Sequence, residues 1–525
     1  MTAEASLDEQ RRGATWGGRG RRALGALLVV SMTLGGSIAA AGSAGAETTY
    51  DPATDPYSMD ALTALTGAEA WWNAGYTGAG VDVAVIDTGV SPVTGLATAG
   101  KVIYGPDLSV ESQASNLRNL DTNGHGTFMA GLIAGKDATL TTPYASAPAS
   151  AYRGIAPDAR IVSVKVGAAD GAVDVSQVIA AIDWVVQHKN DNGMNIRVIN
   201  LSYGTNSGQD SIVDPLSYAA EQAWEKGIMV VAAGGNTGFQ NRVGTAALAD
   251  PAYNRNIMAV GSAETAGTAS FTDDSVPSFS PWPKSGSQKG VDMIAPGTHL
   301  QGLRVPNSHT DTTYASGRLG DRYFRGSGTS QSAALISGAA ALAFQKYPTA
   351  TPDQVKKLLT SSGYALNAKA IAIGGGELQL AKTLTTALPG VTVANQTWVA
   401  ATGLGSLELA RGTDHLTNNG ITLTGEKDIF NKPFNAAAIA TATALGATWS
   451  GGTWNGSTWS GSTWSGSTWS GSTWSGSSWS GSSWSGSTWS GSTWSGSTWS
   501  GSTWSGSTWS GSTWSGSTWS GSSWS

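Results

Sequence analysis

Residues 81–89 read VDVAVIDTG, a short apolar run that ends at Asp87 and is followed by Thr88-Gly89. A run of this kind is typical of a strand buried inside a parallel sheet. Later segments alternate between helical and strand-like patterns: helical at 175–187, apolar at Arg197–Leu201, helical at Pro215–Lys226, apolar at Ile228–Ala233, and an Ala-rich helix at Ala333–Tyr347. This alternation predicts an α/β fold, with a mostly parallel central sheet flanked by helices.

The composition excludes several classes of protein. The 525 residues allow about two to four domains at roughly 150 residues each. Charged residues make up 13% of the chain and the formal net charge is −6, which argues against a nucleic-acid-binding protein or a basic membrane-surface protein. Because the chain has no cysteine, disulfide scaffolds, thiolate metal sites and cysteine nucleophiles are excluded.

The N-terminal residues have the features of an export signal. An arginine-rich stretch is followed by an apolar stretch at 23–41 and by the small-residue pattern Ala44-Gly45-Ala46. This arrangement predicts a signal peptide over residues 1–46 and a secreted protein that begins at Glu47, with retention at the cell surface left open. A transmembrane anchor is the alternative, but the glycines and serines inside the apolar stretch favour a cleaved signal.

The rest of the chain divides into three parts by composition. Residues 47–365 carry the α/β pattern and form one predicted globular domain. Residues 366–446 are a connecting segment of unknown role, with strand-like alternation at Val391–Val399 and no chemical motif. Residues 447–525 repeat a pentapeptide, mostly Ser-Thr-Trp-Ser-Gly, which carries 16 of the 23 tryptophans and no charged residue.

Four short motifs contain the groups that nucleophilic catalysis requires. A carboxylate, Asp87, ends the first strand; an imidazole, His125, is flanked by glycines; and a hydroxyl, Ser330, follows glycines at the predicted start of a helix. Asn236 adds a carboxamide at the end of an apolar strand. In order, the four motifs read VIDTG (85–89), NGHGTFMAG (123–131), AAGGN (232–236) and GSGTSQSA (326–333).

These four side chains suit acyl transfer by a serine. A hydroxyl is a poor nucleophile unless a base takes its proton, and an imidazole with a pKa near neutrality is a suitable base. A carboxylate fixes the tautomer of that imidazole and stabilises its protonated form. The N–H of Ser330 at a helix start and the amide of Asn236 can both donate to the developing oxyanion. Taken singly, each residue has an ordinary explanation as a turn or cap, so it is the combination that indicates a site.

In the order Asp, His, Ser, and with these flanking residues, the motifs resemble those of the subtilisin-like serine proteases, the subtilases, over roughly residues 57–365. With its Trp-rich C-terminal repeat, the chain is similar to an actinobacterial type of this family. The resemblance implies a subtilisin-like fold for the domain at 47–365. It also implies that Ser330 is the nucleophile, His125 the general base and Asp87 the group that orients the base.

The resemblance also identifies residues that contact the substrate. It implies that Asn236 is the oxyanion donor, and that Leu201-Ser202-Tyr203-Gly204 is an edge strand that pairs with the substrate backbone. Thr237 stands where some relatives carry an acid that favours basic side chains, so we expect a broad or apolar preference.

Other positions concern the helix after the nucleophile and the binding of metal ions. Gln331 and Ala334 stand where the family usually has Met and Pro, which leaves the chemistry unchanged but makes the first turn of the helix less rigid. Many relatives bind calcium, so structural calcium stays open for this chain. The metal ligands are unknown, and the loose candidates are Asp137, Asp170 and Asp174.

The period of five in the tail matches no simple element. On an α-helix, successive tryptophans would advance by about 140° and wander around the surface. On a strand, an odd spacing alternates between the two faces. Three interpretations stay open: a flexible stalk or spacer, a module that stacks its tryptophans on cell-wall or other glycans, and a self-packed solenoid-like repeat.

We therefore expect an exported serine endopeptidase that hydrolyses protein or peptide substrates through an acyl-enzyme on Ser330. No cofactor is required for this chemistry, and no nucleic-acid partner is expected. The alternative is a cell-surface binding or structural protein whose protease fold is incidental. A lipase or esterase of the α/β-hydrolase type fits less well, because its order is Ser, acid, His, whereas Ser330 comes last here.

Overall fold

The computed structural model describes residues 50–114, 116–240, 247–284, 288–418 and 421–459. In the repeat tail it also describes the backbone of residues 474–475, 478–486, 494–495, 498–506, 514–515 and 518–521. The predicted signal peptide at 1–46 lies outside the described residues.

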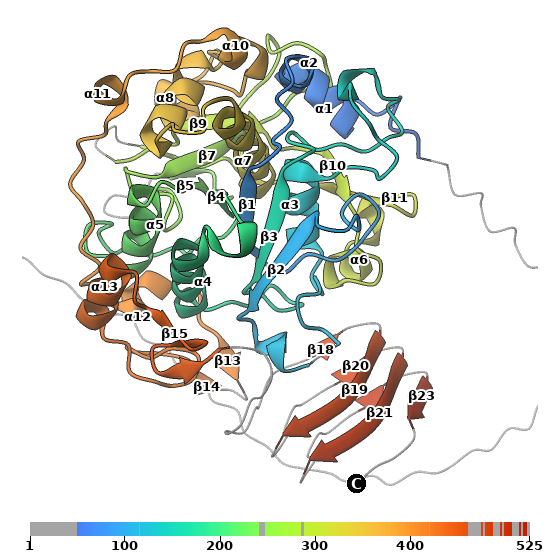
Figure 1. The fold of residues 1–525 in the computed structure, drawn as a ribbon, viewed down its shortest axis with the longest axis vertical. Coiled ribbons are helices and arrows are strands. Elements are labelled where there is room, and N and C mark those ends of the chain that lie inside the picture. The colour runs from blue at the N-terminus through green and yellow to red at the C-terminus, as the bar shows by residue number, and fades with distance from the viewer. Residues whose placement is uncertain are drawn as a thin grey trace, which may run out of the picture. The chain divides into compact units, whose positions relative to one another are not determined.

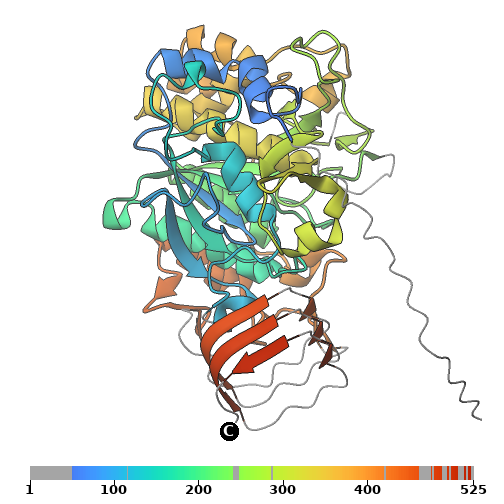
Figure 2. The same ribbon diagram turned by 90° about the vertical axis from the view of Figure 1, so that its right-hand side faces the viewer.

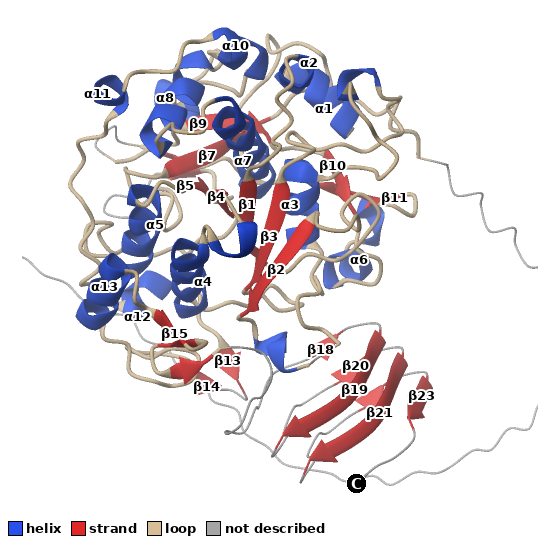
Figure 3. Ribbon diagram, in the orientation of Figure 1, coloured by secondary structure: helices blue, strands red, loops and turns tan. Residues whose placement is uncertain are grey.

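A seven-stranded parallel sheet forms the centre of the structure (Figures 1 and 3). Every pair of neighbouring strands is parallel, which confirms the predicted sheet. All six residues of β1 are buried, as expected for an inner strand with helices on both sides. In spatial order the strands are β2 (Val102–Asp107), β3 (Arg160–Lys165), β1 (Asp82–Asp87), β4 (Ile196–Leu201), β5 (Met229–Ala233), β7 (Met258–Ala263) and β9 (Met293–Pro296).

The helices include those predicted from the sequence. The helical patterns at 175–187 and 215–226 correspond to α4 and α5, and the Ala-rich run corresponds to most of α7. No helix in the described part of the chain combines the length and hydropathy needed to span a bilayer. The described helices are α1 (Met59–Thr66), α2 (Ala68–Asn73), α3 (His125–Ala134), α4 (Val175–His188), α5 (Pro215–Glu225), α6 (His309–Thr313), α7 (Thr329–Lys346), α8 (Pro352–Ser362), α9 (Ala370–Ile373), α10 (Leu380–Thr385), α11 (Val391–Ala394), α12 (Leu407–Arg411) and α13 (Ala436–Leu445).

Two pairs of helices cover the two faces of the sheet (Figures 1 and 2). Helices α3 and α7 pack against each other on one face, and α4 and α5 do so on the other. Residues 331–344 of α7 are all buried, and the helix crosses strands β1, β4, β5, β7 and β9. The many alanines of α7 allow this close packing, because a small side chain keeps helix and sheet near each other.

Short antiparallel strands surround the central sheet. They are β10 (Leu300–Leu303), β11 (Arg318–Leu319) and β12 (Tyr323–Gly326) in one sheet and β13 (Thr417–Asn418) with β14 (Ile421–Thr422) in another, while β6 (Phe239–Gln240) and β8 (Trp282–Pro283) form a parallel pair.

The strand-like alternation at Val391–Val399 does not form a strand. Residues Val391–Ala394 form the short helix α11 instead, and Val391, Val393 and Val399 are exposed. The prediction was wrong because alternation stabilises a strand only where a neighbouring strand supplies hydrogen bonds and a buried face, and this segment lies on the surface of the domain.

Residues 366–446 pack around the domain. Trp71 in α2 donates its indole N–H to the carbonyl of Leu380 at 2.7 Å. On the other side of the molecule, the hydroxyl of Tyr218 in α5 donates to the carbonyl of Ala440 in α13 at 3.0 Å. Figure 1 shows the segment passing from α10 at the top, along the edge of the domain, to α12 and α13. The segment is therefore attached along its length to the helices that cover the sheet.

The first tail repeats pack against helix α4. They form an antiparallel sheet of β15 (Trp449–Ser450), β16 (Thr453–Trp454) and β17 (Ser457–Thr458). The indole N–H of Trp449 donates to the carbonyl of Ala180 at 3.0 Å, and that of Trp454 donates to the carboxylate of Asp183 at 2.8 Å. All three tryptophans of these repeats are buried, the third being Trp459. The repeats next to the domain are therefore part of its packed structure.

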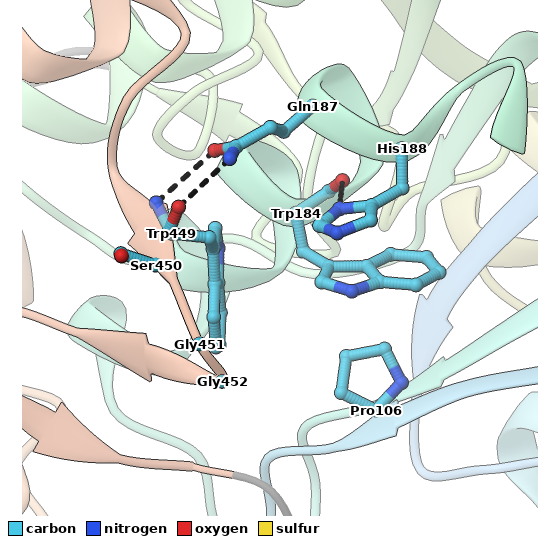
Figure 4. A pocket seen from close by; sticks show the side chains of 8 residues that line it. All are labelled: Pro106, Trp184, Gln187, His188, Trp449, Ser450, Gly451 and Gly452. Carbon is cyan, nitrogen blue, oxygen red and sulfur yellow. Dashed lines mark hydrogen bonds between the residues drawn. The ribbon is translucent and has the colours of Figure 1, made fainter.

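The side-chain amide of Gln187 in α4 forms two hydrogen bonds with the backbone of Trp449 in the first repeat (Figure 4). Its amide nitrogen donates to the carbonyl of Trp449 at 2.8 Å, and its carbonyl oxygen accepts from the N–H of Trp449 at 3.1 Å. A cavity of about 250 Å³ beside this contact is lined by Pro106, Trp184 and His188, and the last two rings stack 4.8 Å apart. The lining of this cavity is largely apolar and comes mainly from α4 and the first repeat. We therefore interpret the cavity as part of the contact between the repeat and α4.

Later repeats pair in parallel at a spacing of twenty residues. Trp474 pairs with Trp494, which pairs with Trp514, and Ser478 pairs with Thr498 in the same way. The strands concerned are β18 (Trp474–Ser475), β19 (Ser478–Gly486), β20 (Trp494–Ser495), β21 (Thr498–Gly506), β22 (Trp514–Ser515) and β23 (Thr518–Gly521). Equivalent positions of every fourth pentapeptide therefore lie side by side in these strands.

We expect the first three tail tryptophans to stabilise the domain. A chain that ends at Ser460 keeps them and should unfold at the same temperature as the full chain, whereas a chain that ends at Gly446 should unfold at a lower temperature. In the full chain, Trp454→Ala should cost about 3–5 kcal/mol of unfolding free energy. Trp398→Ala is the matched control, because Trp398 is 53% exposed. Equal melting temperatures for the two truncated chains would contradict this role.

Asp183 makes the same contact sensitive to pH. Burial raises the pKa of its carboxyl to about 7, although the bonds from Trp454 and Thr443 act against this rise. Between about pH 4 and pH 7 the folded state therefore binds a proton that the unfolded state has lost, and stability falls as pH rises through that window.

Asp183→Asn should remove this pH dependence, because Asn keeps an acceptor oxygen and cannot ionise. Between pH 5 and pH 8 the variant should gain about a few kcal/mol of unfolding free energy relative to the wild type. The melting temperature of the variant should therefore rise relative to that of the wild type over this range. Thermal unfolding at both pH values measures it. A difference that stays constant with pH would show that Asp183 is ionised throughout.

Candidate active site

The structure brings Asp87 and His125 into direct contact. Asp87 is the last residue of β1, and His125 is the first residue of α3. The Nδ1 atom of His125 lies 2.8 Å from Oδ1 and 3.0 Å from Oδ2 of Asp87. The carboxylate is nearly buried, with 4% of its side chain exposed, while 32% of the imidazole is exposed. A buried carboxylate thus orients a ring whose other nitrogen remains available for chemistry.

Close backbone approach makes this contact feasible. A Cβ atom on Gly126 would lie 2.2 Å from the carbonyl oxygen of Gly89, so α3 can meet the end of β1 only with glycine at this position. Gly124, just before the helix, has a positive φ of 103°. The glycine on each side of His125 therefore meets a backbone requirement, which is close approach at Gly126 and a positive φ at Gly124.

Asp121 holds the first turn of α3 in place. Its carboxylate accepts from the backbone N–H groups of Gly124 and Thr127, each at 2.7 Å, and from the hydroxyl of Thr88 at 2.7 Å. The N–H of Thr88 in turn donates to Asp87 at 2.7 Å. One hydrogen-bonded network therefore fixes both the carboxylate and the helix that carries the imidazole. No motif drew attention to Asp121, whose role depends on the turn that follows it.

The electrostatics of this network favour the protonated imidazole. Burial of the ring lowers the pKa of His125, but the negative charge and hydrogen bond of Asp87, with a further contribution from Asp121, outweigh it and raise the pKa above its usual value. The ring is therefore a stronger base than an isolated histidine.

Hydrogen bonds join the start of α7, which carries Ser330, to the segment that carries Asn236. Ser330 is the second residue of α7, and its neighbour Thr329 donates its backbone N–H to the Oδ1 atom of Asn236 at 2.9 Å. The hydroxyl of Thr329 also bonds to the carbonyl of Gly235 at 3.1 Å. This contact occupies the carboxamide oxygen of Asn236, so its NH₂ group is left to donate elsewhere.

A pocket of about 470 Å³ opens beside Ser330 and Asn236. Its walls come from three stretches of chain, at 171–173, 202–204 and 414–416. Within the described part of the chain, the backbone N–H and C=O groups of Tyr203 and Gly204 bond to no other backbone group. The predicted substrate segment is thus placed with Ser202, Tyr203 and Gly204 at the pocket. Leu201 is fully buried as the last residue of β4, and it does not line the pocket.

The sequence motifs did not predict two of these walls, at 171–173 and 414–416. Residues 171–173 follow β3 without a recognisable motif. Residues 414–416 belong to the segment at 366–446, which lacked any chemical motif. Tertiary contacts alone bring Asp414 next to Tyr203, more than 200 residues earlier in the chain.

The calcium candidates are engaged in other contacts. Asp174 caps α4 and pairs with Arg411 at 2.6 Å, and Asp137 pairs with Arg322. Asp170 accepts from the N–H of Ala172 at 3.0 Å. Over the residues that the structure describes, no three acidic or histidine side chains are grouped as a metal site requires. These residues therefore do not fit a calcium site, and no step of the chemistry below involves a metal ion.

The chain is similar in sequence to a known family and to several known proteins. A family model described as the subtilase family matches residues 78–397. Serine protease AprX of Bacillus subtilis (strain 168) is 36% identical over 287 residues, which cover 54% of this chain and 61% of AprX. Subtilisin BL of Lederbergia lenta is 32% identical over 303 residues, which cover 57% of this chain and 89% of that protein. A crystal structure of a cold adapted subtilisin-like serine proteinase is 29% identical with a TM-score of 0.40, and the match covers 55% of this chain and 84% of that one.

The raised pKa of His125 predicts the pH profile of hydrolysis. If His125 accepts the serine proton it must be neutral, so kcat/KM should rise with pH with a midpoint above about 6.5. Asp87→Asn should lower the pH of the midpoint. It should also reduce kcat by about 10⁴-fold, which is the loss that the same change causes in a Ser-His-Asp triad of another fold. Hydrolysis of a peptide between pH 4 and pH 10 measures both effects. An activity maximum below about pH 5 would contradict a histidine base.

Proposed function

Because the chain belongs to the subtilase family, we propose that it is an exported serine endopeptidase that uses Asp87, His125 and Ser330. The observation that carries the proposal is the Asp87–His125 contact at 2.8 Å. It is supported by Ser330 and Asn236, which line one pocket of about 470 Å³. The two relatives described above support it, since one is named a serine protease and the other a subtilisin.

The first step of the proposed reaction is attack by Ser330. The Nε2 atom of His125 takes the hydroxyl proton while Oγ attacks the carbonyl carbon of the peptide bond, and Asp87 stabilises the imidazolium that forms. Oxyanion stabilisation comes from the NH₂ group of Asn236 and the backbone N–H of Ser330. The N-terminal end of the 18-residue helix α7 adds a favourable dipole.

The second step resolves the acyl-enzyme. The imidazolium of His125 gives its proton to the amine nitrogen as the C–N bond breaks, which leaves an ester on Ser330. A water molecule then attacks that ester while His125 takes one of its protons. The same proton passes to Oγ of Ser330 as the ester C–O bond breaks and the acid product leaves. The unbonded backbone groups of Tyr203 and Gly204 can pair with the substrate main chain as an added strand, which selects extended peptides.

Export follows from the predicted signal peptide at 1–46, and the substrates are proteins or peptides met outside the cytoplasm. Contact of the tail with cell-wall or other glycans, and retention at the cell surface, stay predictions that depend on the side chains of the repeats.

A serine-directed fluorophosphonate probe tests the proposal. It should label the protein stoichiometrically at Ser330, and Ser330→Ala should abolish both labelling and hydrolysis, with a loss in turnover on the order of 10⁶-fold as in subtilisin, a relative. Asn236→Ala is the matched variant, because it keeps the nucleophile. It should remain labelled while kcat falls about 10²–10³-fold, a loss also seen in subtilisin.

Two outcomes would overturn the assignment. Well-folded protein that neither reacts with the probe nor hydrolyses peptides would favour the binding-protein alternative. Ser330→Ala protein with more than a tenth of the wild-type activity, after contamination is excluded, would mean that another residue is the nucleophile.

A further inference from the structure

We propose that Asp414 makes the pocket beside Ser330 a binding site for a cationic side chain, so that the protein cleaves after Lys or Arg. This inference rests on the proposed function and names the substrate class of the same site. Asp414 lies beyond residue 397, where the match to the family model ends.

The position of the pocket decides which part of a substrate it receives. Ser330 and Asn236 both line it, so a peptide whose carbonyl carbon is attacked by Ser330 places the side chain of that residue in the pocket. The side chain that enters this space therefore determines the cleavage preference.

The pocket wall combines small or apolar residues with polar ones. Ala172, Val173, Ala233, Ala249 and Leu416 contribute aliphatic surface, and among the residues that the structure describes neither Lys nor Arg lines the pocket. The titratable groups of the wall are Tyr203, Asp414 and His415. A side chain with an aliphatic stem and a positive head matches this combination, because its stem packs on the apolar wall while its head reaches the carboxylate.

The carboxylate of Asp414 is available for such a partner. Its side chain is exposed, and within the described residues it takes part in no hydrogen bond or ion pair. The nearby cation, Arg411, is fully buried and is held by Asp174 at 2.6 Å and by Glu408 at 3.0 Å. The imidazole of His415 is likewise held by Glu408, at 3.0 Å. The negative charge of Asp414 is therefore not neutralised within its own segment.

The electrostatics of Tyr203 agree with this placement. Burial raises the pKa of its hydroxyl well above the usual value, and the charges of Asp174, Asp250 and Asp414 raise it further. Asp414 is thus close enough to Tyr203 for its charge to act on that hydroxyl inside the pocket.

Several hydrogen bonds fix the segment that carries Asp414. The hydroxyl of Thr205 donates to the carbonyl of Ala410 at 2.6 Å. Asn206 accepts from the N–H of Thr413 at 2.8 Å and donates to its hydroxyl at 2.6 Å. Residues 410–413 are therefore fastened to the stretch that follows Tyr203 and Gly204, and this fixes the position of Asp414 relative to the pocket.

Gly412 allows this close contact. It has a φ of 64°, and a Cβ atom there would lie 2.2 Å from the side-chain oxygen of Asn206. The proposal also replaces the preference expected from Thr237. A neutral residue after Asn236 indicated a broad or apolar pocket, whereas the carboxylate comes from a segment that is distant in sequence.

The test compares peptides that differ only in the residue before the cleaved bond, which is Arg, Lys, Leu or Glu. We expect kcat/KM to be highest for Arg and Lys and lowest for Glu. Asp414→Asn should reduce the Arg-over-Leu ratio by about tenfold or more and leave the Leu peptide nearly unchanged, because a charged hydrogen bond is lost only for Arg. High salt should reduce the wild-type ratio in the same direction.

Asp170→Asn is the matched control. Asp170 is also an exposed carboxylate and adjoins Gly171 in the pocket wall, but it does not line the pocket itself. It should leave the Arg-over-Leu ratio within about twofold of wild type. Equal effects of the two substitutions, or a wild-type ratio near one, would overturn the proposal.

A binding measurement separates this inference from the proposed function. Calorimetry with Ser330→Ala protein compares benzamidine, a cation, with benzamide, a neutral molecule of nearly the same shape. Benzamidine should bind at least about tenfold more tightly, and Asp414→Asn should abolish the difference. Equal binding of the two probes would overturn the cationic pocket even if the enzyme is active. Selective benzamidine binding in a protein that hydrolyses no peptide would refute the proposed function and leave the pocket assignment standing.

Discussion

The contact between helix α3 and the end of strand β1 is the constraint on which the candidate site depends. The helix approaches so closely that a single Cβ atom on Gly126 would overlap the carbonyl oxygen of Gly89. This approach places His125 over the buried carboxylate of Asp87 and lets Asp121 cap the helix. A larger residue at position 126 would separate helix and strand, and with them the imidazole of His125 and the carboxylate of Asp87.

The machinery and the walls of the pocket have different structural origins. Asp87 ends a strand, while His125 and Ser330 begin helices that pack on the same face of the sheet, so their positions follow from the core. The wall at 414–416 belongs to a segment added outside the family-matched region and fastened by the fully buried Arg411–Asp174 ion pair.

The start of the repeat tail is attached to the domain by a similar means. Asp183 is buried inside the domain and accepts a hydrogen bond from Trp454, so a polar group in the core is satisfied by a residue of the tail. The cost of burying that carboxyl is visible in its raised pKa. The change in composition at residue 447 therefore does not coincide with the end of the packed structure, which includes the first three tryptophans of the repeat.

By itself, the sequence determined the parallel sheet, the main helices and the four motifs with Asp87, His125, Asn236 and Ser330. Those features depend on local patterns: apolar runs, helical spacing, and glycines beside a reactive residue. Only the tertiary structure decided that Val391–Val399 is not a strand, and that Asp414 and Trp454 contact the domain. Strand formation needs a partner strand, and contacts between residues more than 200 positions apart leave no periodicity in the sequence, so they depend on how the complete chain packs.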